Sequence, residues 1–133
     1  IAADLEKSVR ELAERFDGLT RSRDYIAVRT MIAYMEEHLG DNVGVQDIAA
    51  AAGISVSLAS QLFKQEMNET IHDCFTRMRI ERAARLLVET DDKIADIAAM
   101  VGYQHENSFI RVFRKFNNIT PGKYRELMRN RES

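Results

Sequence analysis

The chain contains one cysteine, Cys74, and one proline, Pro121, among its 133 residues. A single thiol excludes an intrachain disulfide and a cysteine-based zinc cluster. No apolar run approaches the roughly 18 residues that a membrane-spanning helix requires, so the sequence predicts no membrane partner. The chain begins with Ile1 and carries no secretory signal. We therefore expect a further domain upstream of this sequence.

Sequence motifs of enzymes are also missing. There is no Gly-x-Ser-x-Gly, no phosphate-binding loop and no Gly-x-Gly-x-x-Gly. The three histidines, His38, His72 and His105, are far apart and lack the i,i+4 spacing of metal ligands on a helix or a paired carboxylate motif. We therefore expect no catalytic site, no metal site and no required cofactor.

Few residues interrupt helices, because the chain has one proline and six glycines. Apolar residues make up 45% and charged residues 30%, which is typical of a globular domain. Val28, Ile32, Met35 and Leu39 follow one another at spacings of three and four residues. This period is that of an amphipathic helix, and the sequence predicts an all-α fold.

Residues 1–24 are predicted to form an N-terminal amphipathic helix and an arginine-rich linker. The apolar residues of this helix are three or four positions apart: Ile1, Leu5, Val9, Leu12, Phe16 and Leu19. The pattern fits a helix that packs on its own domain, or a connector helix that forms a homodimer with a second copy. Residues 18–24, GLTRSRD, are expected to break the helix, with Asp24 as the N-cap of a second helix over residues 25–39.

The most informative feature is an internal repeat. The stretch IAAAAGI from Ile48 matches IAAMVGY from Ile97 at an offset of 49 residues. Each copy predicts a short alanine-rich helix, a glycine turn and a second helix, which is a helix-turn-helix. We place the two units at about residues 45–64 and 94–116. A helix over residues 70–89 joins them and would be ~27–30 Å long, close to the ~34 Å that separates successive major-groove faces of DNA.

The second helix of each unit carries polar residues opposite its apolar side, on which we place Phe109, Phe113 and Phe116. Amides, guanidinium groups, carboxylates and aliphatic groups can read the edges of bases in the major groove. The expected base contacts are Ser57, Ser60 and Gln61 in the first unit and Glu106, Asn107, Ile110 and Arg111 in the second. The expected phosphate contacts are Lys64, Arg114, Lys115 and Thr120. A merely solvated polar face is the alternative, but the stripe recurs in both units.

The net charge of −2 does not exclude DNA, because phosphate contact requires a basic surface rather than a basic protein. Residues 107–131 contain seven basic residues and one acidic residue, Glu126. Four arginines lie on the joining helix: Arg77, Arg79, Arg82 and Arg85. For Arg79 and Arg82, a structural salt bridge and a phosphate contact are equally expected.

The stretch GYQHENSFIRVFRKFNNITPGKYR, residues 102–125, resembles the signature of the DNA-binding domain of AraC/XylS-family bacterial transcription regulators. RMRIERAARLL from Arg77 and GISVSLASQLFK from Gly53 resemble its linking helix and first recognition helix. The resemblance covers about residues 28–128 and implies that residues 25–133 form a domain of seven helices with two helix-turn-helix subdomains (homeodomain-like). Asn68 and Asn118 stand where glycine is common in the family, and asparagine tolerates the left-handed conformation.

The resemblance also implies a function. It predicts a cytoplasmic, nucleoid-associated bacterial regulator that binds double-stranded promoter DNA, activates transcription and contacts RNA polymerase. The alternative function is a helical protein-interaction module that does not read DNA directly.

The arginine-rich linker suggests control by an effector. Arg21 and Asp24 fit the pattern Arg-x-x-Asp, which resembles the motif by which some bacterial proteins hold cyclic di-GMP. Helix N-termini attract anions, and arginine forks bind phosphate. Our hypothesis is that a guanine dinucleotide binds Arg21, Arg23 and Asp24, together with Arg29. The alternative is an N-capped helix that follows a solvated basic linker.

Overall fold

The computed structural model describes the backbone of residues 2–132. Side chains 1–6, 13, 14, 16, 17, 19, 20, 132 and 133 lie outside the described part, among them Leu5, Phe16 and Leu19. Within it the chain forms seven helices and no strand, which confirms the all-α prediction. The helices are α1 (Ala2–Glu37), α2 (Val45–Ala51), α3 (Val56–Met67), α4 (Ile71–Glu89), α5 (Ile94–Met100), α6 (Glu106–Asn117) and α7 (Pro121–Glu132).

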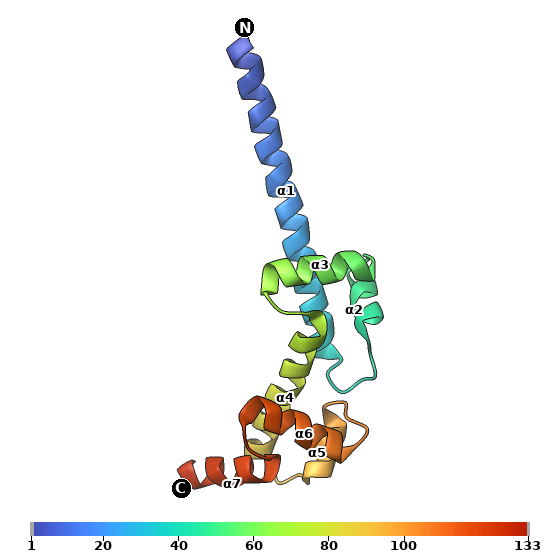
Figure 1. The fold of residues 1–133 in the computed structure, drawn as a ribbon, viewed down its shortest axis with the longest axis vertical. Coiled ribbons are helices and arrows are strands. Elements are labelled where there is room, and N and C mark those ends of the chain that lie inside the picture. The colour runs from blue at the N-terminus through green and yellow to red at the C-terminus, as the bar shows by residue number, and fades with distance from the viewer. Residues whose placement is uncertain (1, 133) are drawn as a thin grey trace.

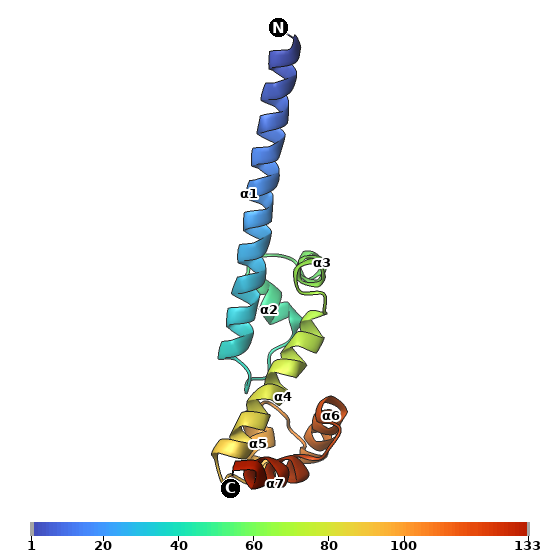
Figure 2. The ribbon, with the colours of Figure 1, turned by 90° about the vertical axis from the view of Figure 1, so that its left-hand side faces the viewer.

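α1 is one continuous helix, and its N-terminal half projects away from the rest of the molecule (Figures 1 and 2). The predicted break at residues 18–24 is therefore wrong, and Asp24 is no N-cap. Glycine costs only about 1 kcal/mol inside a helix, and a helix ends at glycine when the residue turns left-handed. Gly18 does not have a positive φ, and its carbonyl accepts a hydrogen bond from Ser22 Oγ at 3.0 Å.

The helices build two subdomains, each around its own apolar core. The N-terminal subdomain packs the second half of α1 against α2, α3 and the start of α4. Its buried residues are Val28, Met31, Ile32, Met35, Ile48, Ala49, Ala59, Leu62, Phe63, Ile71, Cys74 and Phe75. The C-terminal subdomain packs the second half of α4 against α5, α6 and α7. Its buried residues are Ile80, Ala83, Leu87, Ile97, Ala98, Val101, Phe109 and Phe113.

Local sequence fixes where the helices begin and end. Ser55 and Thr70 cap α3 and α4, because each side-chain oxygen accepts a backbone N–H of the first turn. His105 is the N-cap of α6, but its side chain makes no capping hydrogen bond. Asn68 and Asn118 end α3 and α6 in the left-handed conformation, with φ of 56° and 66°. The asparagines thus replace the family's glycines without loss of the turn.

The C-terminal end of α4 is capped by arginines of α7. Arg125 donates from Nε to the carbonyl oxygen of Leu87 at 2.8 Å and from Nη2 to that of Thr90 at 3.2 Å. Arg129 donates to the same Thr90 carbonyl and pairs with Asp91 at 2.9 Å. Positive charge at a helix C-terminus is favourable because of the helix dipole. α7 therefore holds α4 at a fixed angle to the second helix-turn-helix.

None of the helices across residues 2–132 combines the length and the apolar character that spanning a membrane requires.

Candidate nucleic-acid interface

The two predicted helix-turn-helix units are present. α2 and α3 form the first, α5 and α6 form the second, and α4 joins them. Gly53 and Gly102 make the turns with φ of 70° and 91°, a backbone conformation that residues other than glycine rarely adopt. α3 and α6 run roughly parallel and lie on the same side of α4, where both are seen nearly end-on (Figure 2). Their outer faces therefore point in one direction.

The outer face of α3 carries the residues expected to contact bases in one groove. Ser57, Ser60 and Gln61 are all exposed, as is Lys64 one turn further. These four positions fall within an arc of about 100° around the helix axis. Ala59, Leu62 and Phe63 occupy the opposite side and are buried. The period of the sequence thus separates the core side from the outer side in α3.

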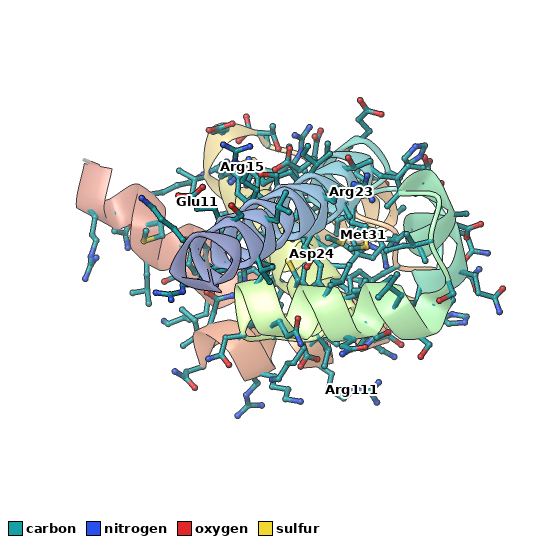
Figure 3. The ribbon with its side chains drawn as sticks, turned by 90° about the horizontal axis from the view of Figure 1, so that it is seen from above. Glu11, Arg15, Arg23, Asp24, Met31 and Arg111 are labelled. Carbon is teal, nitrogen blue, oxygen red and sulfur yellow. The ribbon has the colours of Figure 1, made fainter. Side chains whose placement is uncertain are left out.

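The outer face of α6 carries a more strongly polar set. Glu106, Asn107 and Arg111 are exposed, and Ile110 is half-buried among them. Figure 3 shows Arg111 on the far side of α3 from α1. Phe109 and Phe113 are buried behind this face, with ring centroids 5.7 Å apart. The structure therefore brings six of the seven predicted base-contact residues to exposed positions on α3 and α6, and Ile110 to a half-buried one.

The predicted phosphate contacts lie at the ends of these helices. Lys64 is in the last turn of α3, and Arg114 and Lys115 are in the last turn of α6; all three are exposed. Thr120 lies just before α7, where its hydroxyl oxygen accepts a hydrogen bond from the Lys123 backbone N–H at 3.3 Å. Its side chain thus caps α7 and already has a structural role.

The outer surface also contains apolar residues that the sequence analysis did not assign. Val56 and Leu58 flank Ser57 in the first turn of α3, with 39% and 43% of their surface exposed. The period of α3 gave no signal for them, because Val56 stands three residues before the buried Ala59 and Leu58 stands four residues before the buried Leu62. Phe116 is 42% exposed, so its predicted inward position is wrong. It lines a groove of about 640 Å³ between α4, the end of α6 and Tyr124 of α7.

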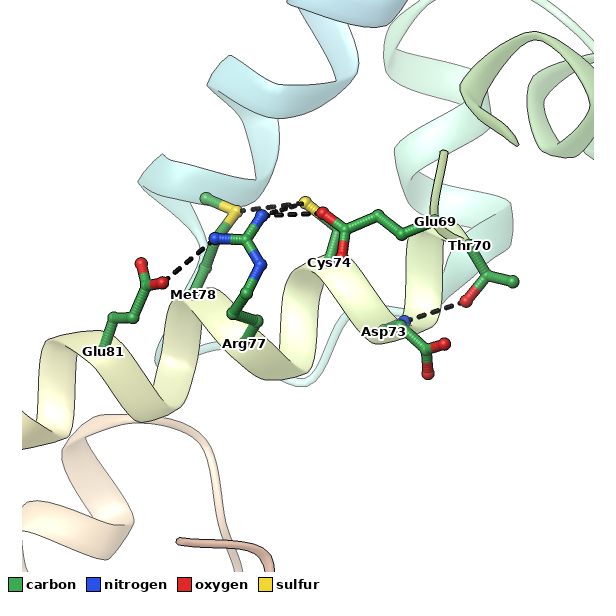
Figure 4. A network of polar contacts seen from close by, with 7 residues as sticks. All are labelled: Glu69, Thr70, Asp73, Cys74, Arg77, Met78 and Glu81. Atoms are coloured by element: carbon green, nitrogen blue, oxygen red, sulfur yellow. Dashed lines mark hydrogen bonds and ion pairs between the residues drawn. The ribbon is translucent and has the colours of Figure 1, made fainter. Parts of the chain in front are cut away.

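Arg77 on α4 takes part in an ion-pair network (Figure 4). Its guanidinium donates to Glu69 Oε1 at 2.7 Å and to Glu81 Oε1 at 3.0 Å. These two hydrogen bonds raise the pKa of Arg77, and the one from Arg77 is the main reason why the pKa of Glu69 is lowered. Cys74 lies beside them and is buried, which raises the pKa of its thiol to about 11. Cys74 is therefore a core residue with an unreactive thiol.

The Glu69–Arg77 pair makes stability depend on pH. Because the pKa of Glu69 is lowered from 4.5, the pair stabilises the fold above that pH, and its contribution is lost as the pH falls through the lowered value. We expect Glu69→Gln to reduce the free energy of unfolding by ~1 kcal/mol or less at pH 7. Denaturant titrations at pH 7 and pH 3 measure this change in the free energy of unfolding.

In that comparison the difference in unfolding free energy between the wild type and Glu69→Gln should be smaller at pH 3 than at pH 7. Glu89→Gln, at an exposed position on the same helix, serves as the control and should show a smaller change at pH 7. A Glu69→Gln penalty that persists undiminished at pH 3 would mean that Glu69 stabilises the fold through something other than its charge.

The arginines of α4 have different roles. Arg79 forms no salt bridge among the described residues: it donates to two backbone carbonyls, those of Leu39 and Asp41, each at 2.9 Å. Arg82 and Arg85 are exposed. With Arg125 and Arg129 engaged at the end of α4, the basic surface is smaller than the count of residues 107–131 indicated.

The predicted nucleotide residues Arg21, Arg23, Asp24 and Arg29 lie in the interior of α1, and no helix begins there. The argument from a helix N-terminus is therefore wrong. Arg23 and Arg15 lie on one side of α1, whereas Asp24 and Met31 lie on the side that faces α3 (Figure 3). Arg23 and Asp24 thus do not converge on one point. Among the residues described, no group of three or more His, Cys, Asp or Glu could hold a metal ion.

Comparison with known proteins agrees with this geometry. The chain is 35% identical over 112 residues to the xylose operon regulatory protein of Escherichia coli (strain K12), which covers 80% of this chain and 29% of that protein. A transcriptional regulator from Chromobacterium violaceum, described as AraC-type DNA-binding, has a TM-score of 0.73 at 26% identity, over 77% of this chain and 91% of the other. The DNA-binding domain of the global transcriptional factor AdpA, solved with a target DNA, has a TM-score of 0.75 at 24% identity, over 78% and 94% of the two chains.

The curated relatives are transcription regulators, and this chain spans 29% to 39% of the length of those most similar to it. A family profile described as a helix-turn-helix domain matches residues 48–127, from α2 into α7. That match includes both units and the helix between them. The chain therefore belongs to the AraC/XylS-type family of helix-turn-helix domains.

Proposed function

We propose that this chain is the DNA-binding part of a transcription regulator and that α3 and α6 enter adjacent major grooves of one duplex. The observation that carries the proposal is the placement of two polar outer faces on the same side of one stiff helix. α4 has 19 residues and is therefore about 28 Å long. Grooves on one side of B-DNA recur about every 34 Å.

The chemistry of the two outer faces predicts two different half-sites. Arg111 can hold a guanine through two hydrogen bonds, and Asn107 can hold an adenine. α3 offers Gln61 and two hydroxyls, which discriminate less strongly between bases. We therefore expect the half-site of α6 to be the more stringent one.

Selection of binding sites from random DNA tests this function. The expected result is enrichment of two unequal half-sites whose centres are about 10–10.5 base pairs apart. Enrichment of a single half-site would show that only one helix reads DNA. No enrichment at all would favour the alternative, a protein-interaction module.

The division between base and phosphate contacts predicts two kinds of variant. Arg111→Ala should cost ~1–3 kcal/mol on the selected site and relax the preference at one base pair. Lys115→Ala should weaken binding to all sequences to a similar extent, because a phosphate contact carries no sequence information. Titration of both variants against matched and single-mismatch duplexes measures the difference. Identical behaviour of the two would contradict the assignment.

The proposal includes a homodimer formed through the projecting half of α1. Val9 and Leu12, three residues apart in the projecting half, are 59% and 65% exposed, and Ile26, two heptads after Leu12, is 61% exposed. Val28 and Met35 fall on the opposite side of the helix, in the core. Two copies can thus pair through α1 without displacing their own DNA-binding domains. Light scattering of the purified chain tests the dimer, and a monomer at micromolar concentration would contradict it.

Three further parts of the proposal follow from the family alone. The DNA is promoter DNA, RNA polymerase is contacted during activation, and an effector controls the regulator. Cyclic di-GMP at Arg21, Arg23, Asp24 and Arg29 is now supported only by the Arg-x-x-Asp pattern on exposed turns of α1. Calorimetric titration with cyclic di-GMP tests it, and the absence of heat at micromolar concentration would remove this effector from the proposal.

A further inference from the structure

The two subdomains share little besides α4. The N-terminal core ends on α4 at Phe75, and the C-terminal core begins on the same helix at Ile80. Apart from α4, no helix of one subdomain packs extensively on a helix of the other among the seven described. The angle between α3 and α6 therefore depends on the stiffness of α4 and on whatever second contact joins the halves.

That second contact is a backbone junction between residues 39–41, which follow α1, and residues 100–102, which end α5. A Cβ atom on Gly40 would lie 2.5 Å from the carbonyl oxygen of Met100. A Cβ atom on Gly102 would lie 2.8 Å from the carbonyl oxygen of Leu39. Because real Cβ atoms essentially never approach so closely, the two segments touch through their main chains.

Arg79 occupies this junction. It lies on α4 between the two cores, and its guanidinium is 4.1 Å from the centroid of the Phe75 ring. Nε and Nη2 donate to the carbonyl oxygens of Leu39 and Asp41, each at 2.9 Å. On its other side, the guanidinium lies 2.9 Å from the point where a Cβ on Gly102 would be. One planar group thus touches the N-terminal subdomain's loop and the turn of the second helix-turn-helix.

We propose that Arg79 is a positioning residue that fixes the relative placement of α3 and α6, and with it the separation of half-sites that the protein accepts. This inference rests on the proposed function. The guanidinium suits the role because it is planar and forks two donors toward two acceptors. A lysine there would keep the positive charge but offer a single point of attachment.

The proposal separates Arg79 from a phosphate contact. A phosphate contact depends on charge, and Lys in place of Arg preserves it to a large extent. A positioning role for Arg79, which we call the brace, depends on the planar shape of the guanidinium and its two forked donors. Arg79→Lys and Arg79→Ala should therefore behave alike. Arg79 is half-buried, and this burial lowers the pKa of its guanidinium.

The first test measures tolerance of half-site spacing. The wild type, Arg79→Ala and Arg79→Lys are titrated against the selected site and against the same site with one base pair inserted between the half-sites, which turns one half-site by about 35°. The wild type should bind the inserted site at least about tenfold more weakly. In both variants this penalty should shrink to about threefold or less. Arg82→Ala, at an exposed position one turn along α4, is the control and should keep the wild-type penalty.

The outcomes of this test are distinct. If the wild type binds and discriminates between the sites, but Arg79→Ala remains folded by circular dichroism and discriminates equally, Arg79 does not set the spacing. If Arg79→Lys keeps the full penalty while Arg79→Ala loses it, the role depends on charge and the brace is wrong. If the wild type binds no DNA, the proposed function fails. A second measurement then tests the positioning role of Arg79 independently.

That second measurement needs no DNA. Spin labels are attached to Gln65→Cys on α3 and Lys115→Cys on α6, both exposed positions. The native Cys74 should not react, because it is buried and its pKa is about 11. The distribution of distances between the labels should be narrow in the otherwise wild-type protein and clearly broader with Arg79→Ala. Equal widths in a folded variant would overturn the inference.

Discussion

Affinity for DNA is expected to fall by at least about fortyfold when the salt concentration rises from 50 to 200 mM. Three exposed basic side chains are assigned to phosphates: Lys64, Arg114 and Lys115. Each neutralised phosphate releases counterions and adds about −0.9 to the slope of log affinity against log salt, so three predict a slope near −2.7. Fluorescence anisotropy of a labelled duplex at several salt concentrations measures this slope.

Two variants sharpen the test, one that removes a charged side chain and one that removes an uncharged side chain. Lys115→Ala should make the slope shallower by about 0.9, whereas Gln61→Ala should lower the affinity and leave the slope unchanged. A partner protein bound through apolar surface would show little dependence on salt. A flat slope in the wild type would therefore favour the protein-interaction module over the DNA-binding regulator.

Phe113→Ala is expected to destabilise the C-terminal subdomain by about 3–5 kcal/mol. The ring is fully buried and contacts the rings of Phe109 and Tyr124, with centroids 5.7 and 5.4 Å away. Its removal leaves a cavity in a core of only eight buried residues. Since a small domain has a total stability of about 5–15 kcal/mol, much of the second helix-turn-helix should open. Hydrogen exchange, resolved by segment, measures the effect.

The separate cores predict where that loss is confined. Amides of α5 and α6 should exchange much faster in Phe113→Ala, whereas those of α2 and α3 should change little. Phe116→Ala on the same helix is the control, because its ring is 42% exposed, and it should cost ~1 kcal/mol or less. Equal acceleration throughout both subdomains would show that the two cores unfold as one unit.

Helix boundaries and outer faces were predictable where the sequence repeats. The offset between Ile48 and Ile97 located both units, and the apolar period placed Phe109 and Phe113 inside and Gln61 and Arg111 outside. These assignments succeed because a helix of twelve residues has one buried side, and period alone identifies it. Whether those outer residues contact bases stays a prediction.

Other features depend on contacts that the sequence does not encode locally. The prediction of a break at Gly18 is wrong because a glycine ends a helix only when it adopts the left-handed conformation and capping contacts follow. Phe116 continues the apolar period of α6, but its ring is partly exposed and is not one of the buried residues of the C-terminal core. Arg79 and Arg125 bond to carbonyls 35 to 40 positions away, so only the tertiary structure distinguishes them from arginines that are free to approach phosphate.

The continuity of α1 has a mechanical consequence. Its 36 residues form a rod about 54 Å long in which each residue advances about 1.5 Å and turns about 100°. Because the far end of the rod is anchored in the core at Met31, twisting the projecting end applies a torque to the first helix-turn-helix instead of being absorbed by a hinge. One residue inserted ahead of Val28 would rotate whatever precedes it by about a quarter turn, whereas seven inserted residues would nearly restore the original phase.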